Sequence, residues 1–347
     1  MGRLSTTYLG LELRTPLVAS AGPLTGRPAQ AERMQDCGAS AIVLPSLFEE
    51  EITRQDSDLL LALEAGSEHF AEALDYFPDF TKRAFESAAD RYLSVVHEMK
   101  QRLSVPVIAS LNGTSPGGWV RYAKLMQEAG ADALELNLYR VAADPARSAA
   151  EVEGDDLSVI SSVAQALSIP LAVKIAPYYT SLAHFAAAVV EAGADGLVLM
   201  NRFYQPDLDP DTREVVSRLE LSRPWELRLP LRWTAILRAQ LRRRASLAIT
   251  TGVWSGADAA KALLVGADVA MMTSAALANG PEHFCTVERE LVQWLDANEY
   301  IDVEELRGSV SYAATDDPGG FERANYLRLL HSWTAPYPLT PSSPSGE

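Results

Sequence analysis

Short runs of apolar residues alternate with longer amphipathic stretches along most of the chain. Eight of these runs are typical of strands, because each is brief, nearly uninterrupted and rich in Val, Ile, Leu and Ala. They comprise residues 16–21, 41–44, 106–111, 133–137, 170–175, 196–200, 246–250 and 269–272. Apolar strands separated by amphipathic helices indicate a parallel sheet whose faces the helices cover.

A recurring triplet marks the turns between predicted helices and strands. It reads Gly38-Ala39-Ser40, Gly130-Ala131-Asp132, Gly193-Ala194-Asp195 and Gly266-Ala267-Asp268. Glycine at this position accepts the left-handed backbone that ends a helix. The triplets precede the second, fourth, sixth and eighth predicted strands. We therefore predict an α/β fold, a (β/α)₈ TIM barrel, with a doubly wound open sheet as the alternative.

Two intervals between strands are longer than a strand and its crossover helix require. They predict insertions at about residues 46–85, after strand two, and 201–233, after strand six. Both insertions follow strands, and the loops that follow strands carry the catalytic residues of TIM barrels. We expect a single barrel domain over residues 1–333 and a disordered tail over 334–347, which is rich in Pro and Ser.

The amino-acid composition argues against several classes of function. Of 347 residues, 48% are hydrophobic and 22% are charged, which is enough apolar material for a large core. The formal net charge of −16 argues against a surface that binds nucleic acid or an anionic membrane. No apolar run reaches the ~18 residues that a membrane span needs. Two cysteines, Cys37 and Cys285, are too few for a disulfide framework or a zinc site, and the histidines show no metal-ligand spacing. We expect a cytoplasmic protein in a reducing compartment, without a metal.

Polar residues at predicted strand ends should meet at the mouth of the barrel. Lys174 interrupts an otherwise apolar strand, where an ammonium is costly to bury without a partner. It could hold an anionic ligand, stabilise a reduced flavin or form a Schiff base, or it could extend to solvent at a strand edge. Asn137 and Asn201 each end a strand, and their carboxamides suit a flavin or pyrimidine edge or a loop contact.

The connections after strands seven and eight begin with Thr251-Gly252 and Thr273-Ser274. Barrels often bind phosphate at this place, with backbone N–H groups and a helix N-terminus. Small residues and hydroxyls there suit a phosphate monoester. The alternative is two ordinary turns with N-capping hydroxyls.

Several stretches, in this order and spacing, resemble the dihydroorotate dehydrogenases, the FMN-dependent barrels of pyrimidine synthesis. They read TTYLGLELRTPLVASAGPLT, LELN, LAVKIAPYY, ITTGVWSGADAAKALLVGADVAMMTSAAL and NGPEHF. The resemblance covers about residues 5–300 and is strongest to the soluble branch. It implies an FMN cofactor, a small-molecule substrate and a homodimer.

Residue roles follow from the same resemblance. It places Ala21 and Gly22 beside the flavin, and Asn137 and Lys174 at the polar edge of the flavin ring. Asn201 would face the substrate. The FMN phosphate would be held by the residues after strands seven and eight, namely Thr251, Gly252, Thr273 and Ser274.

Departures from the family pattern concern the substrate side. The position of the usual Cys or Ser base carries Arg140, and an arginine cannot give up its proton to act as that base. Tyr139, Ser148 or a carboxylate of the 46–85 insertion could substitute. Arg140 would suit an anionic substrate, or it is a solvated loop residue. A glycine-rich turn expected after strand six is also absent.

These observations leave three hypotheses. The first is an FMN-dependent dehydrogenase acting on a CH–CH group, with dihydroorotate or a different anionic substrate. The second is a non-catalytic flavin-binding partner of a redox complex. The third is a Schiff-base barrel enzyme with Lys174 as nucleophile.

Overall fold

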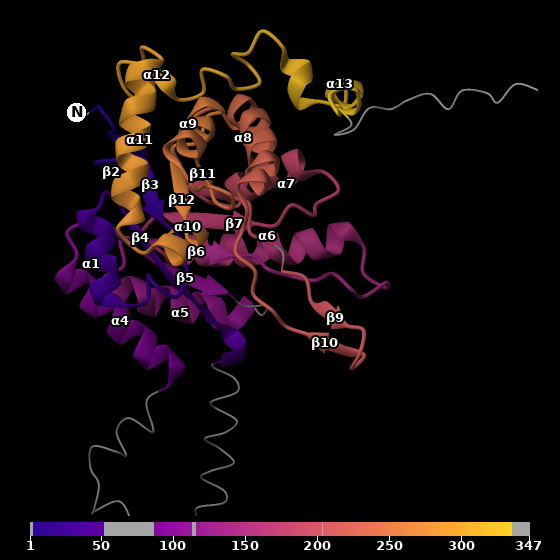
Figure 1. The fold of residues 1–347 in the computed structure, drawn as a ribbon. Coiled ribbons are helices and arrows are strands. Elements are labelled where there is room, and N and C mark those ends of the chain that lie inside the picture. Colours follow the sequence, from indigo (N-terminus) through magenta and orange to yellow (C-terminus); the bar gives the residue numbers. More distant parts are fainter. Residues whose placement is uncertain (1–2, 52–86, 113–115, 203, 335–347) are drawn as a thin grey trace, which may run out of the picture.

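The computed structural model describes residues 3–51, 87–112, 116–202 and 204–334, and they form a barrel (Figure 1). Eight strands close on themselves in the order β11-β12-β3-β4-β5-β6-β7-β8, and every neighbouring pair is parallel. The strands are β3 Leu17–Ala19, β4 Ile42–Phe48, β5 Val107–Asn112, β6 Ala133–Asn137, β7 Leu171–Ile175, β8 Gly196–Leu199, β11 Ser246–Ile249 and β12 Val269–Met272. The TIM barrel predicted from the sequence is confirmed, and each strand coincides with a predicted apolar run.

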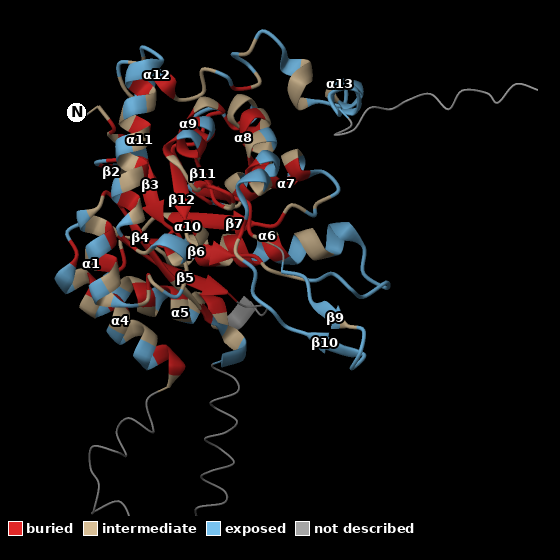
Figure 2. Cartoon of the chain, in the orientation of Figure 1, coloured by how far each residue is buried: buried red, intermediate tan, exposed pale blue. Residues whose placement is uncertain are grey.

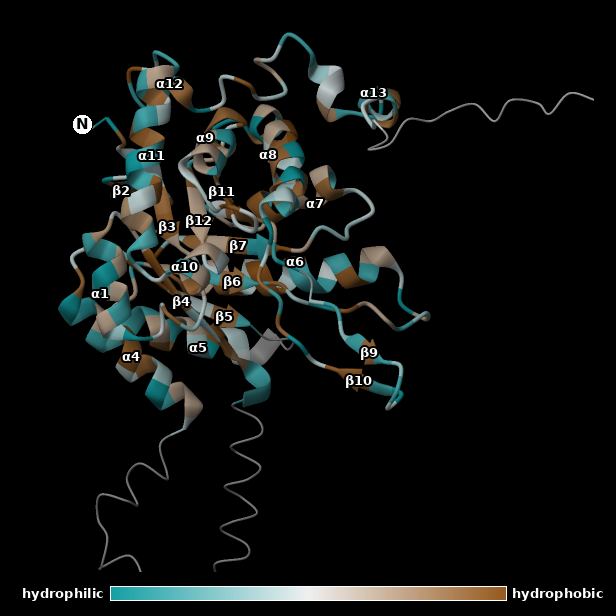
Figure 3. Cartoon of the chain, in the orientation of Figure 1, coloured by the Kyte–Doolittle hydropathy of each residue, from teal (hydrophilic) through white to brown (hydrophobic). Residues whose placement is uncertain are grey.

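Helices surround the barrel and turn their apolar faces towards it (Figures 2 and 3). Serine residues at positions 87, 148 and 255 cap three of them, each in a reciprocal capping box. The longer helices are α1 Pro28–Asp36, α4 Ala88–Arg102, α5 Pro116–Glu128, α6 Ala149–Ala166, α7 Leu182–Glu191, α8 Arg228–Leu241, α9 Gly256–Leu264 and α11 His283–Ala297. The shorter ones are η1 Pro224–Leu227, α10 Ser274–Asn279, α12 Val303–Leu306, η2 Pro318–Phe321 and α13 Asn325–His331.

Small and β-branched side chains fill the inside of the barrel. A buried cluster of Val18, Val43, Ala133, Ala172 and Ala248, with their neighbours, is separate from the larger cluster between strands and helices. Because side chains alternate along a strand, the next inward position towards the carboxyl end is Glu135 on β6 and Lys174 on β7. The interior therefore changes from apolar to polar as it approaches the mouth.

Strand β4 runs further than the apolar pattern predicts, through Pro45 to Phe48. Proline has no N–H to donate to the ladder, and the register with β5 shifts between Val43 and Ser46. Residues 46–48, assigned from the sequence to the first insertion, are thus part of the strand. Residues 52–86 of that insertion, and 335–347 of the predicted disordered tail, lie outside the described residues.

Two hairpins were not predicted, because strands of three residues carry too short a pattern. The first, β1 Thr6–Tyr8 and β2 Leu11–Leu13, turns at Leu9 and Gly10, both with positive φ, and contributes to the base of the barrel. The second, β9 Asp207–Asp209 and β10 Glu214–Val216, belongs to the insertion after β8 and extends from the body of the molecule (Figure 1).

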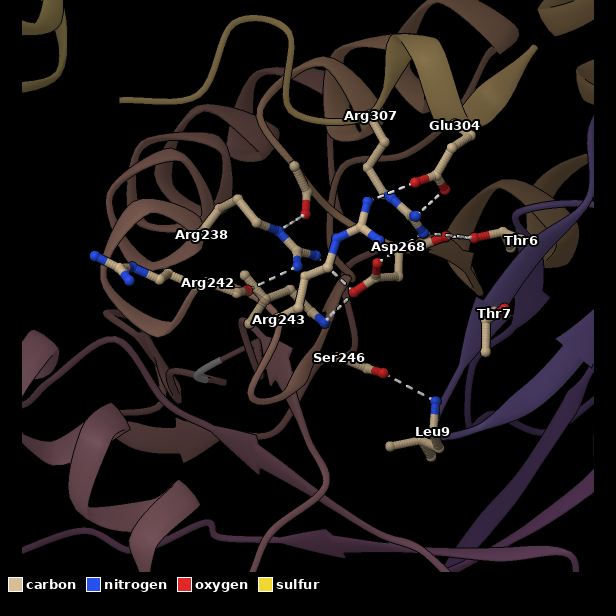
Figure 4. A network of polar contacts seen from close by, with 12 residues as sticks. Thr6, Thr7, Leu9, Arg238, Arg242, Arg243, Ser246, Asp268, Glu304 and Arg307 are labelled. Carbon is tan, nitrogen blue, oxygen red and sulfur yellow. Dashed lines mark hydrogen bonds and ion pairs between the residues drawn. The ribbon is translucent and has the colours of Figure 1, made fainter. Parts of the chain in front are cut away.

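At the base of the barrel, Asp268 is the centre of a polar network (Figure 4). Its carboxylate accepts hydrogen bonds from Arg238 (2.6 Å), Arg307 (3.0 Å) and the backbone N–H of Leu247 (2.7 Å). Its backbone carbonyl accepts from Thr6 in the N-terminal hairpin. One residue, Asp268, therefore connects β1, α8, β11 and the segment after α12.

A disulfide joins Cys37, after α1, to Cys285 in α11. Their Cα atoms lie 4.4 Å apart, although 248 positions separate them in the sequence. Two cysteines are too few for a disulfide framework, and their positions in the sequence gave no way to predict that they pair. This disulfide also differs from what we expect of a protein in a reducing compartment, where cysteines usually stay reduced.

Among the described residues, the structure contains no helix with the length and apolar character that a membrane crossing requires.

Candidate functional site

The mouth of the barrel contains a cavity of about 130 Å³, called here the mouth pocket. It lies where β3, β7, β8, β11 and β12 end, and residues 219–222 of the insertion after β8 form one wall. Most of the residues that the sequence singled out are brought together in its lining: Ala21, Gly22, Lys174, Asn201, Thr251, Gly252, Thr273 and Ser274. These residues come from segments as much as 253 positions apart in the sequence, and only closure of the barrel makes them neighbours.

Lys174 lies inside the barrel, and its side chain is 9% exposed. Its Nζ is 3.4 Å from Oε1 of Glu135, whose side chain is 1% exposed. The other carboxylate oxygen of Glu135 has no hydrogen-bond partner among the described residues. Buried ion pairs stabilise a fold only when their remaining polar atoms are also satisfied. A long contact with an unsatisfied oxygen is instead typical of a site that keeps a polar group for a ligand.

Asn137 and Asn201 contact each other directly. The Nδ2 of Asn201 donates to Oδ1 of Asn137 at 2.6 Å, and both residues are 9% exposed. Asn137 is the last residue of β6 and Asn201 follows β8, so their bond spans the end of β7 next to Lys174. Within the described part of the chain, no hydrogen bond uses the side-chain N–H groups of Asn137, so they can donate to another group at the mouth.

The turn after β11 has a backbone that favours glycine. Thr251 has φ +75° and Gly252 has φ +83°. A β-branched residue in this left-handed region is strained, and such strain is found where function requires one backbone shape. The Thr251 hydroxyl donates to the carbonyl of Met200 (3.1 Å), which holds the turn in place. A Cβ on Gly252 would lie 2.5 Å from the backbone nitrogen of Leu227, so glycine is required there.

The end of β12 packs closely against the end of β3. The Thr273 hydroxyl donates to the carbonyl of Ser20 (3.0 Å), and a Cβ on Gly22 would lie 2.5 Å from Cγ2 of Thr273. This glycine therefore allows two strand ends to approach. Ala21 and Ser274 line the cavity from the same side.

The structure places Arg140 outside the mouth pocket. Its guanidinium pairs with Asp156 of α6 (3.2 Å), and both residues line a separate cavity of about 240 Å³. Burial raises the pKa of Asp156 from 3.8 to about 6, against the opposing effect of Arg140. The Tyr139 hydroxyl accepts a hydrogen bond from the backbone N–H of Tyr204 (3.1 Å), so it is tied to the insertion after β8.

Several polar residues of the mouth were missed as site residues, among them Glu135, Arg202, Glu220 and Ser222. Glu135 interrupts an apolar strand just as Lys174 does, and the same criterion would have found it. Arg202 directly follows Asn201 and lines the pocket, where it pairs with Glu226 (3.2 Å). Glu220 and Ser222 come from the insertion, whose sequence gives no sign that it turns back over the mouth.

The donors of the mouth pocket fit the phosphate end of FMN. The strained turn at Thr251 and Gly252 and the hydroxyls of Ser222 and Ser274 meet at one end of the cavity. Lys174 and its incompletely satisfied partner Glu135 lie towards the barrel axis. The enclosed space matches a phosphate group, and a ligand as large as FMN would extend into the open mouth.

Comparisons with known proteins give a consistent result. The family model described as dihydroorotate dehydrogenase matches residues 3–295. A protein of Aeropyrum pernix, provisionally named dihydroorotate dehydrogenase A (fumarate), is 26% identical over 88% of this chain and 96% of its own length. The catalytic subunit of dihydroorotate dehydrogenase B (NAD(+)) of Methanothermobacter thermautotrophicus is 25% identical over 88% and 97%. The chloroplastic dihydropyrimidine dehydrogenase (NADP(+)) of Arabidopsis thaliana is 20% identical over 90% and 78%.

Proposed function

The chain belongs to the dihydroorotate dehydrogenase family, and on that premise we propose that it is an FMN-dependent oxidoreductase whose chemistry takes place in the mouth pocket. The observation that carries the proposal is the buried Lys174 in the same cavity as the strained turn at Thr251 and Gly252. A flavin mononucleotide needs a phosphate-binding turn at one end and a cation beside its ring at the other.

The residues of the chain would have separate tasks. The hydroxyls and the turn around Gly252 and Ser274 hold the phosphate. The ammonium of Lys174 stabilises negative charge at the polar edge of the ring, and Asn137 offers N–H donors beside it. FMN, when bound, supplies the capacity to accept a hydride from the substrate.

The substrate would be a small anion that is oxidised at a CH–CH bond. Arg202 lines the mouth pocket and is 22% exposed in its side chain, so it supports an anionic ligand from inside the cavity. Arg140 could contribute only after leaving Asp156. The position of the usual Cys or Ser base carries Arg140, which lies outside the mouth pocket, so the test of function includes other small anions beside dihydroorotate.

An absorbance spectrum of the purified protein tests the cofactor. We expect a flavin spectrum, or its appearance when FMN is added, and bleaching when a suitable substrate is added without oxygen. Dihydroorotate is the first substrate to test. Lys174→Met should retain the folded protein and slow bleaching by roughly 100-fold. Protein that remains colourless with excess FMN would refute the proposal.

The same experiment separates the alternatives. FMN bound without reduction by any candidate substrate, together with a co-purifying protein, would favour a flavin-binding partner in a redox complex. Borohydride trapping of a carbonyl compound on Lys174 would favour the Schiff-base enzyme. The homodimer implied by the resemblance and the cytoplasmic location expected from the composition stay predictions, which sedimentation and cell fractionation can test.

A further inference from the structure

Ser222 lies in the phosphate end of the mouth pocket although it belongs to the insertion after β8. It is 4% exposed. Its hydroxyl donates to the hydroxyl oxygen of Ser274 (2.9 Å) and accepts from the backbone N–H of Gly252 (3.4 Å). It therefore lies between two groups that come from the connections after β11 and β12, the pair to which a phosphate site was assigned.

The backbone of Ser222 is held independently of its hydroxyl. Its N–H donates to Ser274 Oγ (3.0 Å), and its carbonyl accepts from Nε1 of Trp254 (2.9 Å). A hydroxyl on a fixed backbone can turn its proton from Ser274 to an incoming oxygen at little cost. No movement of the insertion is needed.

Ser222 also sets the direction of Ser274. The Ser274 oxygen accepts two hydrogen bonds, both from Ser222. Among the described residues its own proton has no acceptor, so it is available to a ligand in the cavity. The contact of Gly252 with Ser222 is long for an N–H···O bond, so a charged oxygen would compete for that N–H effectively.

We propose that Ser222 is a phosphate-binding residue supplied by the insertion after β8, the segment that lacks the glycine-rich turn expected after strand six. This inference rests on the proposed function and extends it. Ser222 binds a phosphate oxygen through its hydroxyl and orients Ser274 as a second donor. The insertion after β8 thereby contributes to cofactor binding as well as covering the mouth.

Flavin titration of the full chain, freed of bound flavin, tests the inference. FMN and riboflavin differ only in the phosphate, and quenching of flavin fluorescence gives the dissociation constant for each. We expect Ser222→Ala to weaken FMN binding by about tenfold to a hundredfold, the usual worth of a hydrogen bond to a charged group. Riboflavin binding should change by less than about twofold. Ser222→Thr, which keeps the hydroxyl, should restore most of the FMN affinity.

The control is Ser217→Ala, an exposed serine in the same insertion, which should bind both flavins as the wild type does. Thermal unfolding of each variant shows whether the fold is intact. Equal weakening of FMN and riboflavin by Ser222→Ala would reduce Ser222 to a structural role, and an unchanged or tighter FMN affinity would exclude it as a phosphate ligand. Those results overturn this inference alone, whereas wild-type protein that binds neither flavin overturns the proposed function itself.

Discussion

The two ends of the barrel use buried charge in opposite ways. At the base, the Asp268 carboxylate receives three hydrogen bonds of 2.6–3.0 Å, two of them from arginines. At the mouth, Glu135 makes one contact of 3.4 Å with Lys174, and its second oxygen has no partner among the described residues. Both carboxylates are less than 10% exposed.

This difference indicates which end serves stability and which serves binding. A fully satisfied network holds the N-terminal hairpin and the segment after α12 on the barrel (Figure 4). The mouth keeps unsatisfied groups and a strained turn at Thr251, both of which lower stability unless a ligand uses them. The same contrast between a structural base and a functional mouth is a general property of TIM barrels.

The largest effect is expected at the base. Asp268→Ala removes the common partner of Arg238 and Arg307, whose side chains are 14% and 13% exposed. Arg307 keeps its ion pair with Glu304, whereas Arg238 loses its carboxylate partner. Leaving this buried charge uncompensated should lower the free energy of unfolding by about 3–5 kcal/mol. Urea unfolding measures this loss, and FMN binding at the far end should not change.

The matched control is Asp296→Ala, which breaks an ion pair with Arg3 whose side chains are 36% and 59% exposed. Exposed pairs contribute about 0–1 kcal/mol. If the two variants lose the same stability, or if Asp268→Ala also weakens FMN binding, the base is not the separate structural element described above.

A smaller effect on stability, with a larger effect on chemistry, is expected at the mouth. Lys174→Met leaves Glu135 buried without its cation and should cost about 2–4 kcal/mol of unfolding free energy. The double variant Lys174→Met/Glu135→Met removes both charges, so it should recover much of that loss. Flavin reduction should stay slow in both variants. A double variant as unstable as the single one would show that Glu135 does not depend on Lys174.

Hydrophobic periodicity predicted the eight strands and favoured a barrel, because each strand is buried on both sides and so reads as an apolar run. It could not exclude an open doubly wound sheet, and the closure of the strands comes from the structure. The periodicity also located Lys174, since a charge in such a run is conspicuous. It could not show that Ser222 reaches the mouth or that Cys37 meets Cys285, because these contacts depend on how irregular or distant segments fold back. Arg140 illustrates the opposite limit. Its sequence position suggested the mouth, but Asp156 of α6 holds it in another cavity.

The smallest expected effect concerns Asp156, which lines the separate cavity beside Arg140. Its pKa is raised in the folded protein to about 6 from the ordinary 3.8, chiefly by burial. The folded state therefore binds this proton more tightly than the unfolded state. The resulting stability is fully present below about pH 3.8 and is lost as the pH rises through about 6. Between pH 7 and pH 5, the wild type should gain about 1 kcal/mol of unfolding free energy relative to Asp156→Asn.

Urea unfolding of both proteins at the two pH values measures this difference and cancels the other titrating groups. Asp155→Asn is the matched control, because that neighbouring carboxylate is 54% exposed and pairs with Arg147 at the surface. It should track the wild type at both pH values. If the wild type instead loses stability relative to Asp156→Asn on acidification, the ion pair with Arg140 outweighs burial. Arg140 would then be held firmly away from the mouth, and the cations facing an anionic substrate would be those that line the mouth pocket, Lys174 and the Glu226-paired Arg202.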